Sequence, residues 1–169
     1  GLSYEVFLLM QLKIASDSDN SMKLREFESV AVTLSLSRQV ESTWEVFSSA
    51  MTKYGARKTF DMACSLVRSF GRAGLMEESQ KITNLMQLRR PEKRDWTWEH
   101  RVLLDCAFIH AALSCAQIDV AGNTFACIPK RVGGKGSASG TPGSKAILDS
   151  GVNLINTLEA HGQRVESML

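Results

Sequence analysis

The stretch that decides the fold is SLVRSFGRAGLMEESQKITNLM, residues 65–86, in which Gly74 divides two apolar patterns. Apolar side chains recur every three or four residues on both sides of Gly74, which is the period of one face of an α-helix. The acidic pair Glu77 and Glu78 follows the glycine, where the dipole of a new helix favours negative charge. We therefore predict two helices joined by a tight turn at Gly74. The predicted core positions of this hairpin are Leu66, Val67, Phe70, Ser79, Ile82 and Met86.

The same pattern occurs in two other parts of the chain. Residues 27–51 fit it with Arg38 at the turn, and residues 105–129 fit it with Ala116 at the turn. The turn positions are 36 residues (74 − 38) and 42 residues (116 − 74) apart. A hairpin of this size cannot bury its apolar face alone, so neighbouring hairpins are expected to stack. The other predicted core positions are Val30, Ala31, Leu34, Thr43, Val46, Phe47, Ala50, Phe108, Ile109, Ala112, Ala121, Phe125 and Ile128.

Both ends of the chain resemble half of this unit. SYEVFLLM, residues 3–10, matches TWEVFSSA, residues 43–50, which belongs to a predicted second helix. Residues 152–168 read as a first helix, a turn at Gly162 and the start of a second helix. We expect the apolar ends of the stack to be covered by further chain or by partners.

The fold predicted from these patterns is all-α, a right-handed α-solenoid of stacked helix-turn-helix repeats. Its predicted parts are a half-repeat (1–15), repeats at 24–53, 60–88 and 98–129, a flexible Gly/Ser-rich linker (130–145) and a terminal helical half-repeat (146–169).

The hairpin around Gly74 resembles a pentatricopeptide repeat. The resemblance lies in Arg72-Ala73-Gly74 at the turn, in the acidic pair with Ser79 at the start of the second helix, and in Met86 at its end. It implies an organellar RNA-associated protein, in a mitochondrion or a plastid, in which each repeat can address one base. The base-reading positions carried over from the family fall at Glu28, Thr59, Cys64 and Cys106, and none of the pairs they form matches the usual reading pairs of the family.

Degenerate readers, few repeats and a net charge of only +2 favour RNA binding through backbone charge and shape. We therefore expect a structural component of a mitochondrial or plastid ribosome, or of another ribonucleoprotein, with RNA and neighbouring protein subunits as partners. The alternative is a protein–protein scaffold subunit of a large complex that does not contact RNA.

Basic and aromatic side chains concentrate in one connection and one linker. Arginine and lysine can neutralise phosphates, and tryptophan can stack on an unpaired base or anchor the next helix in the core. The candidate RNA-binding residues are Arg89, Arg90, Lys93, Arg94, Trp96, Trp98, Arg101, Lys130 and Arg131.

Other kinds of site are disfavoured by the sequence. The four cysteines form no C-x-x-C pair, and the linker lacks the glycine and hydroxyl residue of a P-loop. No apolar run reaches the length of a membrane span, and no catalytic pair or triad can be defended. We therefore predict no metal site, cofactor, membrane partner or enzymatic activity.

Overall fold

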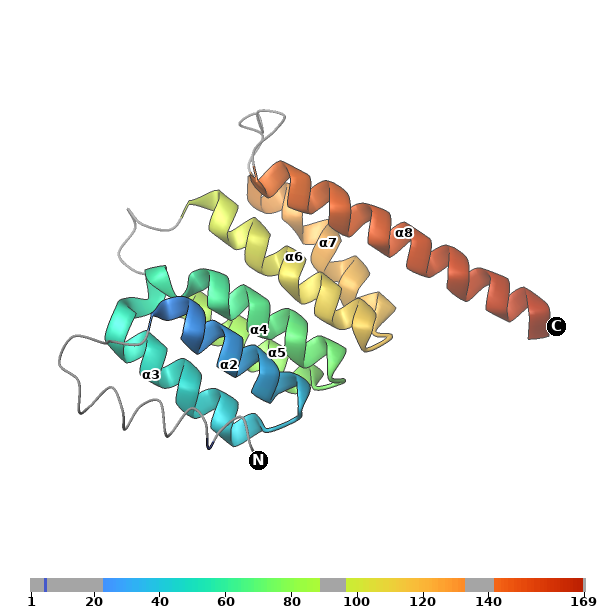
Figure 1. Cartoon of the computed structure of the whole chain (residues 1–169). Helices are drawn as coiled ribbons and strands as arrows, with labels where there is room; N and C mark the ends of the chain where they lie inside the picture. The colour runs from blue at the N-terminus through green and yellow to red at the C-terminus, as the bar shows by residue number, and fades with distance from the viewer. Residues whose placement is uncertain (1–4, 6–22, 89–96, 133–141, 169) are drawn as a thin grey trace.

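The computed structural model describes residues 5, 23–88, 97–132 and 142–168 (Figure 1). All regular structure in these ranges is α-helical, which confirms the predicted all-α class. Among the described residues the helices are α2 (Leu24–Leu36), α3 (Val40–Lys58), α4 (Phe60–Arg72), α5 (Met76–Leu88), α6 (Trp98–Ser114), α7 (Ile118–Val132) and α8 (Pro142–Met168).

The helices pair into consecutive hairpins, α2–α3, α4–α5 and α6–α7, followed by α8. Helices α2, α4, α6 and α8 contact one another in chain order, and we call them the first-helix row (Figure 1). Each of α3, α5 and α7 packs chiefly on the first helix of its own hairpin. Helix α8 packs on α6 as α6 packs on α4, so it occupies the place of a fourth first helix.

The three hairpin turns have the same backbone geometry. Arg38, Gly74 and Ala116 have φ angles of +59°, +75° and +57°, in the left-handed region that closes a helix in a Schellman turn. The amide after each of them donates a hydrogen bond across the turn, from Gln39 to the Leu34 carbonyl (2.9 Å), Leu75 to Phe70 (2.8 Å) and Gln117 to Ala112 (2.9 Å). The turn positions aligned from the sequence are therefore confirmed.

The core agrees with the helical pattern of the sequence. Of the predicted core positions, only Val30 and Phe125 are half-buried, and all the others are buried. Two clusters result, one spanning α2 to α6 and one joining α6, α7 and α8. Burial of these apolar faces stabilises the fold by roughly 25 cal/mol per Å² removed from water. Part of this burial arises between hairpins, because the hairpins lie side by side.

Helices α4 and α6 approach each other closely at Gly71. A Cβ atom added there would lie 2.3 Å from the Ala111 Cα atom, and the Cys115 thiol donates to the Gly71 carbonyl at 3.3 Å. The absence of a side chain at residue 71 thus sets the spacing of the second and third hairpins.

Polar contacts connect successive hairpins. The Arg38 Nε atom donates to the Ala73 carbonyl at 2.9 Å, which links one turn to the next. The Trp44 indole of α3 donates to the Glu78 carboxylate of α5 at 2.7 Å. Burial raises the pKa of Glu78, but hydrogen bonds from Lys81 and Trp44 outweigh this effect and bring the pKa below its usual 4.5. The carboxylate is therefore charged at neutral pH.

Two expectations about the C-terminal part need correction. Helix α8 continues through Gly162, so the predicted turn there does not form. One glycine costs a helix about 1 kcal/mol, which is too little to end it where good helix formers follow. In the range predicted as a linker, 130–145, residues 130–132 belong to α7 and residues 142–145 belong to α8, which begins at Pro142, a residue that suits the first turn of a helix. The rest of that range lies outside the described residues. The predicted half-repeat at residues 1–15 lies outside the described residues apart from Glu5, which is helical.

We predict that Gly71→Ala destabilises the protein by about 1–3 kcal/mol, because the new methyl group overpacks against Ala111. The matched control is Gly122→Ala in α7, where nothing lies within 4 Å and alanine should stabilise the helix by about 0.5–1 kcal/mol. Urea unfolding monitored by circular dichroism measures both changes. Equal effects of the two substitutions would contradict the close approach of α4 and α6.

We also predict opposite effects on stability for two substitutions at the hairpin turns. Ala116→Gly should raise the free energy of unfolding by about 1 kcal/mol, because it removes the strain of an alanine at positive φ. Gly74→Ala should lower it by a similar amount. The same urea measurement checks both signs, and destabilisation by Ala116→Gly would show that the turn is not left-handed.

Candidate nucleic-acid interface

The four base-reading positions do not share an open surface. Glu28 is half-buried and accepts a hydrogen bond of 2.7 Å from the Ser65 hydroxyl of α4. Thr59 is buried and donates to the Gly55 carbonyl at 3.0 Å. Cys64 and Cys106 are 5% and 3% exposed. Burial raises the pKa of Cys64 to about 12, so this thiol stays neutral at physiological pH.

Most of the basic and aromatic residues predicted to contact RNA lie outside the part of the chain that the structure describes. Arg89, Arg90, Lys93, Arg94 and Trp96 lie outside the described residues, and they remain predicted contacts. Lys130 and Arg131 belong to the last turn of α7, and the structure describes their backbone but not their side chains.

Two members of this set are described. Arg101 is exposed on α6. Trp98 is half-buried and packs with the cluster that joins α6 to α8, and its ring lies 3.2 Å from where a Cβ atom of Gly143 would be. Trp98 therefore packs on α8, and its contact with RNA stays a prediction.

The first-helix row contains two adjoining hollows that sequence reasoning did not identify. One, of about 620 Å³, lies between α6 and α8, and the other, of about 370 Å³, is bordered by α4, α6 and α8. His110 and Ser114 line both, so the two hollows adjoin each other across three helices. Apolar side chains, among them Leu103, Leu113 and Ile118, line them beside the polar ones. We use the name polar groove for the surface formed by Arg68, Arg72, His110, Ser114, Asn153, Asn156 and Thr157.

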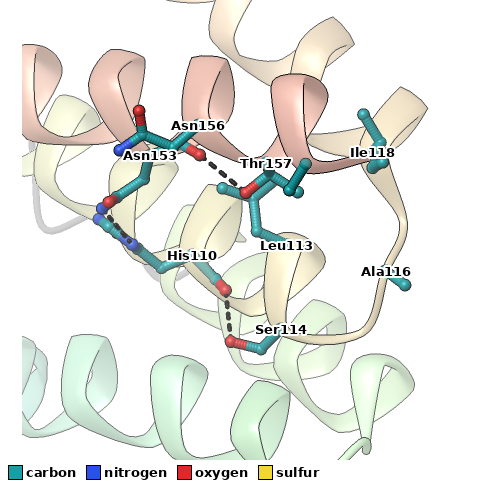
Figure 2. A pocket seen from close by; sticks show the side chains of 9 residues that line it. His110, Leu113, Ser114, Ala116, Ile118, Asn153, Asn156 and Thr157 are labelled. Atoms are coloured by element: carbon teal, nitrogen blue, oxygen red, sulfur yellow. Dashed lines mark hydrogen bonds between the residues drawn. The ribbon is translucent and has the colours of Figure 1, made fainter. Parts of the chain in front are cut away.

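Figure 2 shows how the side chains of α8 face those of α6 in the larger hollow. The Asn153 side-chain amide lies 3.4 Å from the His110 Nδ1 atom, and the Ser150 hydroxyl lies 3.4 Å from Nε2. The Ser114 and Thr157 hydroxyls each donate to a carbonyl of their own helix, at 2.8 Å. Their oxygens keep lone pairs that can accept hydrogen bonds from a ligand.

The groove residues occupy equivalent positions of successive hairpins. Arg68 and Arg72 stand six and two residues before the turn residue Gly74, and His110 and Ser114 stand six and two residues before Ala116. On α8 the corresponding pair is Asn153 and Thr157, 43 residues further on (153 − 110 and 157 − 114). Helices α4, α6 and α8 thus each add one pair of side chains to a double row, and the repeat period is the signal that could have found the pairs on α4 and α6.

Charge is concentrated at the α4 end of the groove. Arg68 and Arg72 are exposed, and among the described residues no carboxylate lies within ion-pair distance of either guanidinium. Two guanidinium groups one helical turn apart offer several hydrogen-bond donors to an anion. Asp149 on α8 is the acidic residue that borders the same hollow.

His110 lies between the charged and the amide-rich parts of the groove. Burial and the positive charges of Arg68 and Arg72 lower its pKa below the usual 6.5, while Asp149 acts in the opposite direction. The ring is therefore neutral at pH 7, with one nitrogen able to donate and the other able to accept. A half-buried neutral imidazole can also stack on a planar ligand.

In the part of the chain that the structure describes, no three histidine, cysteine, aspartate or glutamate side chains gather as metal ligands would. Within the same ranges, no helix combines the length and the hydropathy needed to cross a membrane. Comparison of the chain with protein families, curated proteins and solved structures gives no match.

We predict that Arg68→Ala and Arg72→Ala each raise the pKa of His110, because each removes a nearby positive charge. Asp149→Asn should lower it. Two-dimensional NMR titration of the imidazole measures the shifts, with Arg57→Ala on α3 as the control that leaves them unchanged. A His110 pKa that does not respond to Arg68 or Arg72 would contradict the groove geometry.

Proposed function

We propose that this chain is a right-handed pentatricopeptide-like solenoid that binds single-stranded RNA along the first-helix row, in the polar groove. The observation that carries the proposal is the double row of equivalent side chains on α4, α6 and α8. It combines two arginines without ion-pair partners among the described residues with hydroxyl, imidazole and amide groups on the next two helices.

The groups of the groove divide into two chemical kinds. Arg68 and Arg72 match phosphate oxygens, which they can bind through paired N–H donors. Asn153 and Asn156 each carry both donors and an acceptor, the combination that pairs with the edge of an unstacked base. A strand that follows the row would place its phosphates near α4 and expose a base to α6 and α8.

We further propose a setting in a mitochondrial or plastid ribonucleoprotein, the ribosome in particular. The pentatricopeptide resemblance at residues 63–86 supports this setting. The burial of Cys64 and Cys106 and the modest net charge of +2 favour a protein that holds RNA by shape and local charge within a larger assembly.

A second candidate function is that of a protein–protein scaffold without RNA contact. It is favoured by exposed apolar side chains on α8, where Leu148, Val152 and Ile155 are 67%, 48% and 56% exposed. The two functions differ in salt dependence, because phosphate contacts weaken steeply with salt whereas apolar burial does not.

The test is binding of a fluorescent, uridine-rich single-stranded RNA, measured by anisotropy over a range of salt concentrations. The double variant Arg68→Ala/Arg72→Ala should bind at least about ten-fold more weakly and reduce the salt slope by about 1.4, or roughly 0.7 for each lost phosphate contact. The matched control is Arg57→Ala/Lys58→Ala, which removes the same charge from the last turn of α3.

The control variant should bind RNA like the wild type. Equal losses in both variants would indicate a non-specific charge effect, and undiminished binding by Arg68→Ala/Arg72→Ala would refute the site. Wild-type protein that binds no RNA at low salt would leave the scaffold function as the better account.

A further inference from the structure

His110 lies where the two hollows of the polar groove meet, because its side chain lines both of them. Arg68 and Arg72 of α4 border the smaller hollow. Asn153 of α8 faces the imidazole in the larger one (Figure 2). A titratable ring therefore stands between the cationic and the amide-rich parts of the groove, where its charge affects the binding of an anion.

The surroundings of the ring carry an excess of positive charge. Burial opposes protonation of His110 most strongly, and the guanidinium groups of Arg68 and Arg72 add to this effect. The Asp149 carboxylate of α8 acts in the opposite direction. Helices α5 and α7 also pack on α6, but none of the charged side chains described on these two helices acts on the ring. Within α6, Cys106 borders the smaller hollow, and its thiol stays neutral because burial raises its pKa.

The neighbours of the ring on α8 can serve both of its protonation states. The Ser150 hydroxyl is fully buried, lies 3.4 Å from the Nε2 atom and also forms a hydrogen bond with the Cys106 thiol. It can donate to an unprotonated Nε2, or accept from a protonated one while it donates to the sulfur. The Asn153 side chain, 3.4 Å from Nδ1, can present its NH₂ group or, after rotation of the amide, its oxygen. Protonation of His110 therefore needs no rearrangement of the helices.

A phosphate group bound at Arg68 and Arg72 would reverse the charge balance around His110. It neutralises the two guanidinium groups that oppose protonation, and it adds its own negative charge to the same hollow. Because the imidazole is half-buried, salt screens these interactions less than it screens those between fully exposed groups. A filled groove thus favours the protonated ring, and by reciprocity a protonated ring favours the filled groove.

We propose that the groove binds a phosphate group at Arg68 and Arg72 together with a proton on His110, and therefore holds RNA more tightly at mildly acidic than at neutral pH. This coupling rests on the RNA binding proposed above and adds a regulatory property to the same site. Binding raises the pKa of the imidazole, which fixes the sign of the effect. The extra affinity is complete below the pKa of the free protein, which lies under 6.5, and disappears as the pH rises above the pKa of the complex.

The test is anisotropy of the same uridine-rich RNA, labelled with a pH-insensitive dye, at about pH 5.5 and about pH 7.5 and at constant ionic strength. The wild type should bind about three- to ten-fold more tightly at the lower pH, since a rise of one pH unit in the pKa on binding corresponds to at most about tenfold in affinity. His110→Gln keeps a polar side chain that cannot ionise, and it should lose most of this difference. The matched control His100→Gln changes a histidine in the first turn of α6 that packs on Phe60, and it should keep the wild-type ratio.

NMR titration of His110 tests the coupling without RNA, with sulfate as an oxyanion that does not titrate in this range and chloride of equal ionic strength as the reference. Sulfate should raise the pKa of His110 by about 0.5–1 in the wild type. In Arg68→Ala/Arg72→Ala it should leave that pKa unchanged.

The two measurements separate failure of the coupling from failure of the RNA function. RNA binding with the same pH response in the wild type and in His110→Gln would overturn the coupling and leave the RNA function standing. If the wild type binds no RNA at either pH, the RNA function fails, and the sulfate titration decides the coupling. A raised His110 pKa then supports an anion site linked to proton uptake, and an unchanged one overturns it.

Discussion

The structure depends on one backbone constraint, the left-handed residue that ends each first helix. At Arg38, Gly74 and Ala116 the chain adopts positive φ and reverses through the same hydrogen bond. Two of these residues are not glycine, although a side chain at positive φ costs about 1–2 kcal/mol. The turn is nevertheless kept, because the second helix must return along the first to bury the apolar face of both.

From this constraint the stack and its surface follow. Identical turns give hairpins of similar shape, and the contact of Gly71 with Ala111 brings α4 and α6 close together. Residues at the same distance before each turn then come side by side on α4 and α6, as Arg72 and Ser114 do. Helix α8 has no such turn, and it adds Thr157 to the groove by packing on α6.

The sequence was sufficient for the hairpins and their turns, because helical periodicity is a local signal. The turn at Arg38 was identified by aligning the helical pattern of residues 27–51 with that around Gly74, and the structure confirms it. Local signals misled at Gly162, where a glycine flanked by helix-forming residues remains helical. They also left the role of Trp98 open, since whether its ring meets solvent or α8 depends on a contact 45 residues away (143 − 98).

The candidate site was harder to predict than the fold. Family positions pointed to Cys64 and Cys106, which the packing of neighbouring helices buries. The groove instead consists of residues such as His110 and Asn153, whose chemistry becomes visible only when three helices are set in register. Which residue of α8 lies beside a given residue of α6 cannot be predicted from composition, because a linker separates the two parts of the chain and the repeats differ in length.

The most direct test of this account is photocrosslinking of 4-thiouridine-containing single-stranded RNA to the full chain, with the crosslinked peptides mapped by mass spectrometry. Crosslinks should fall on α4, α6 and α8, around Arg72, His110 and Asn153. Crosslinks confined to α3, α5 and α7 would contradict the claim that the aligned first helices form an RNA-binding surface.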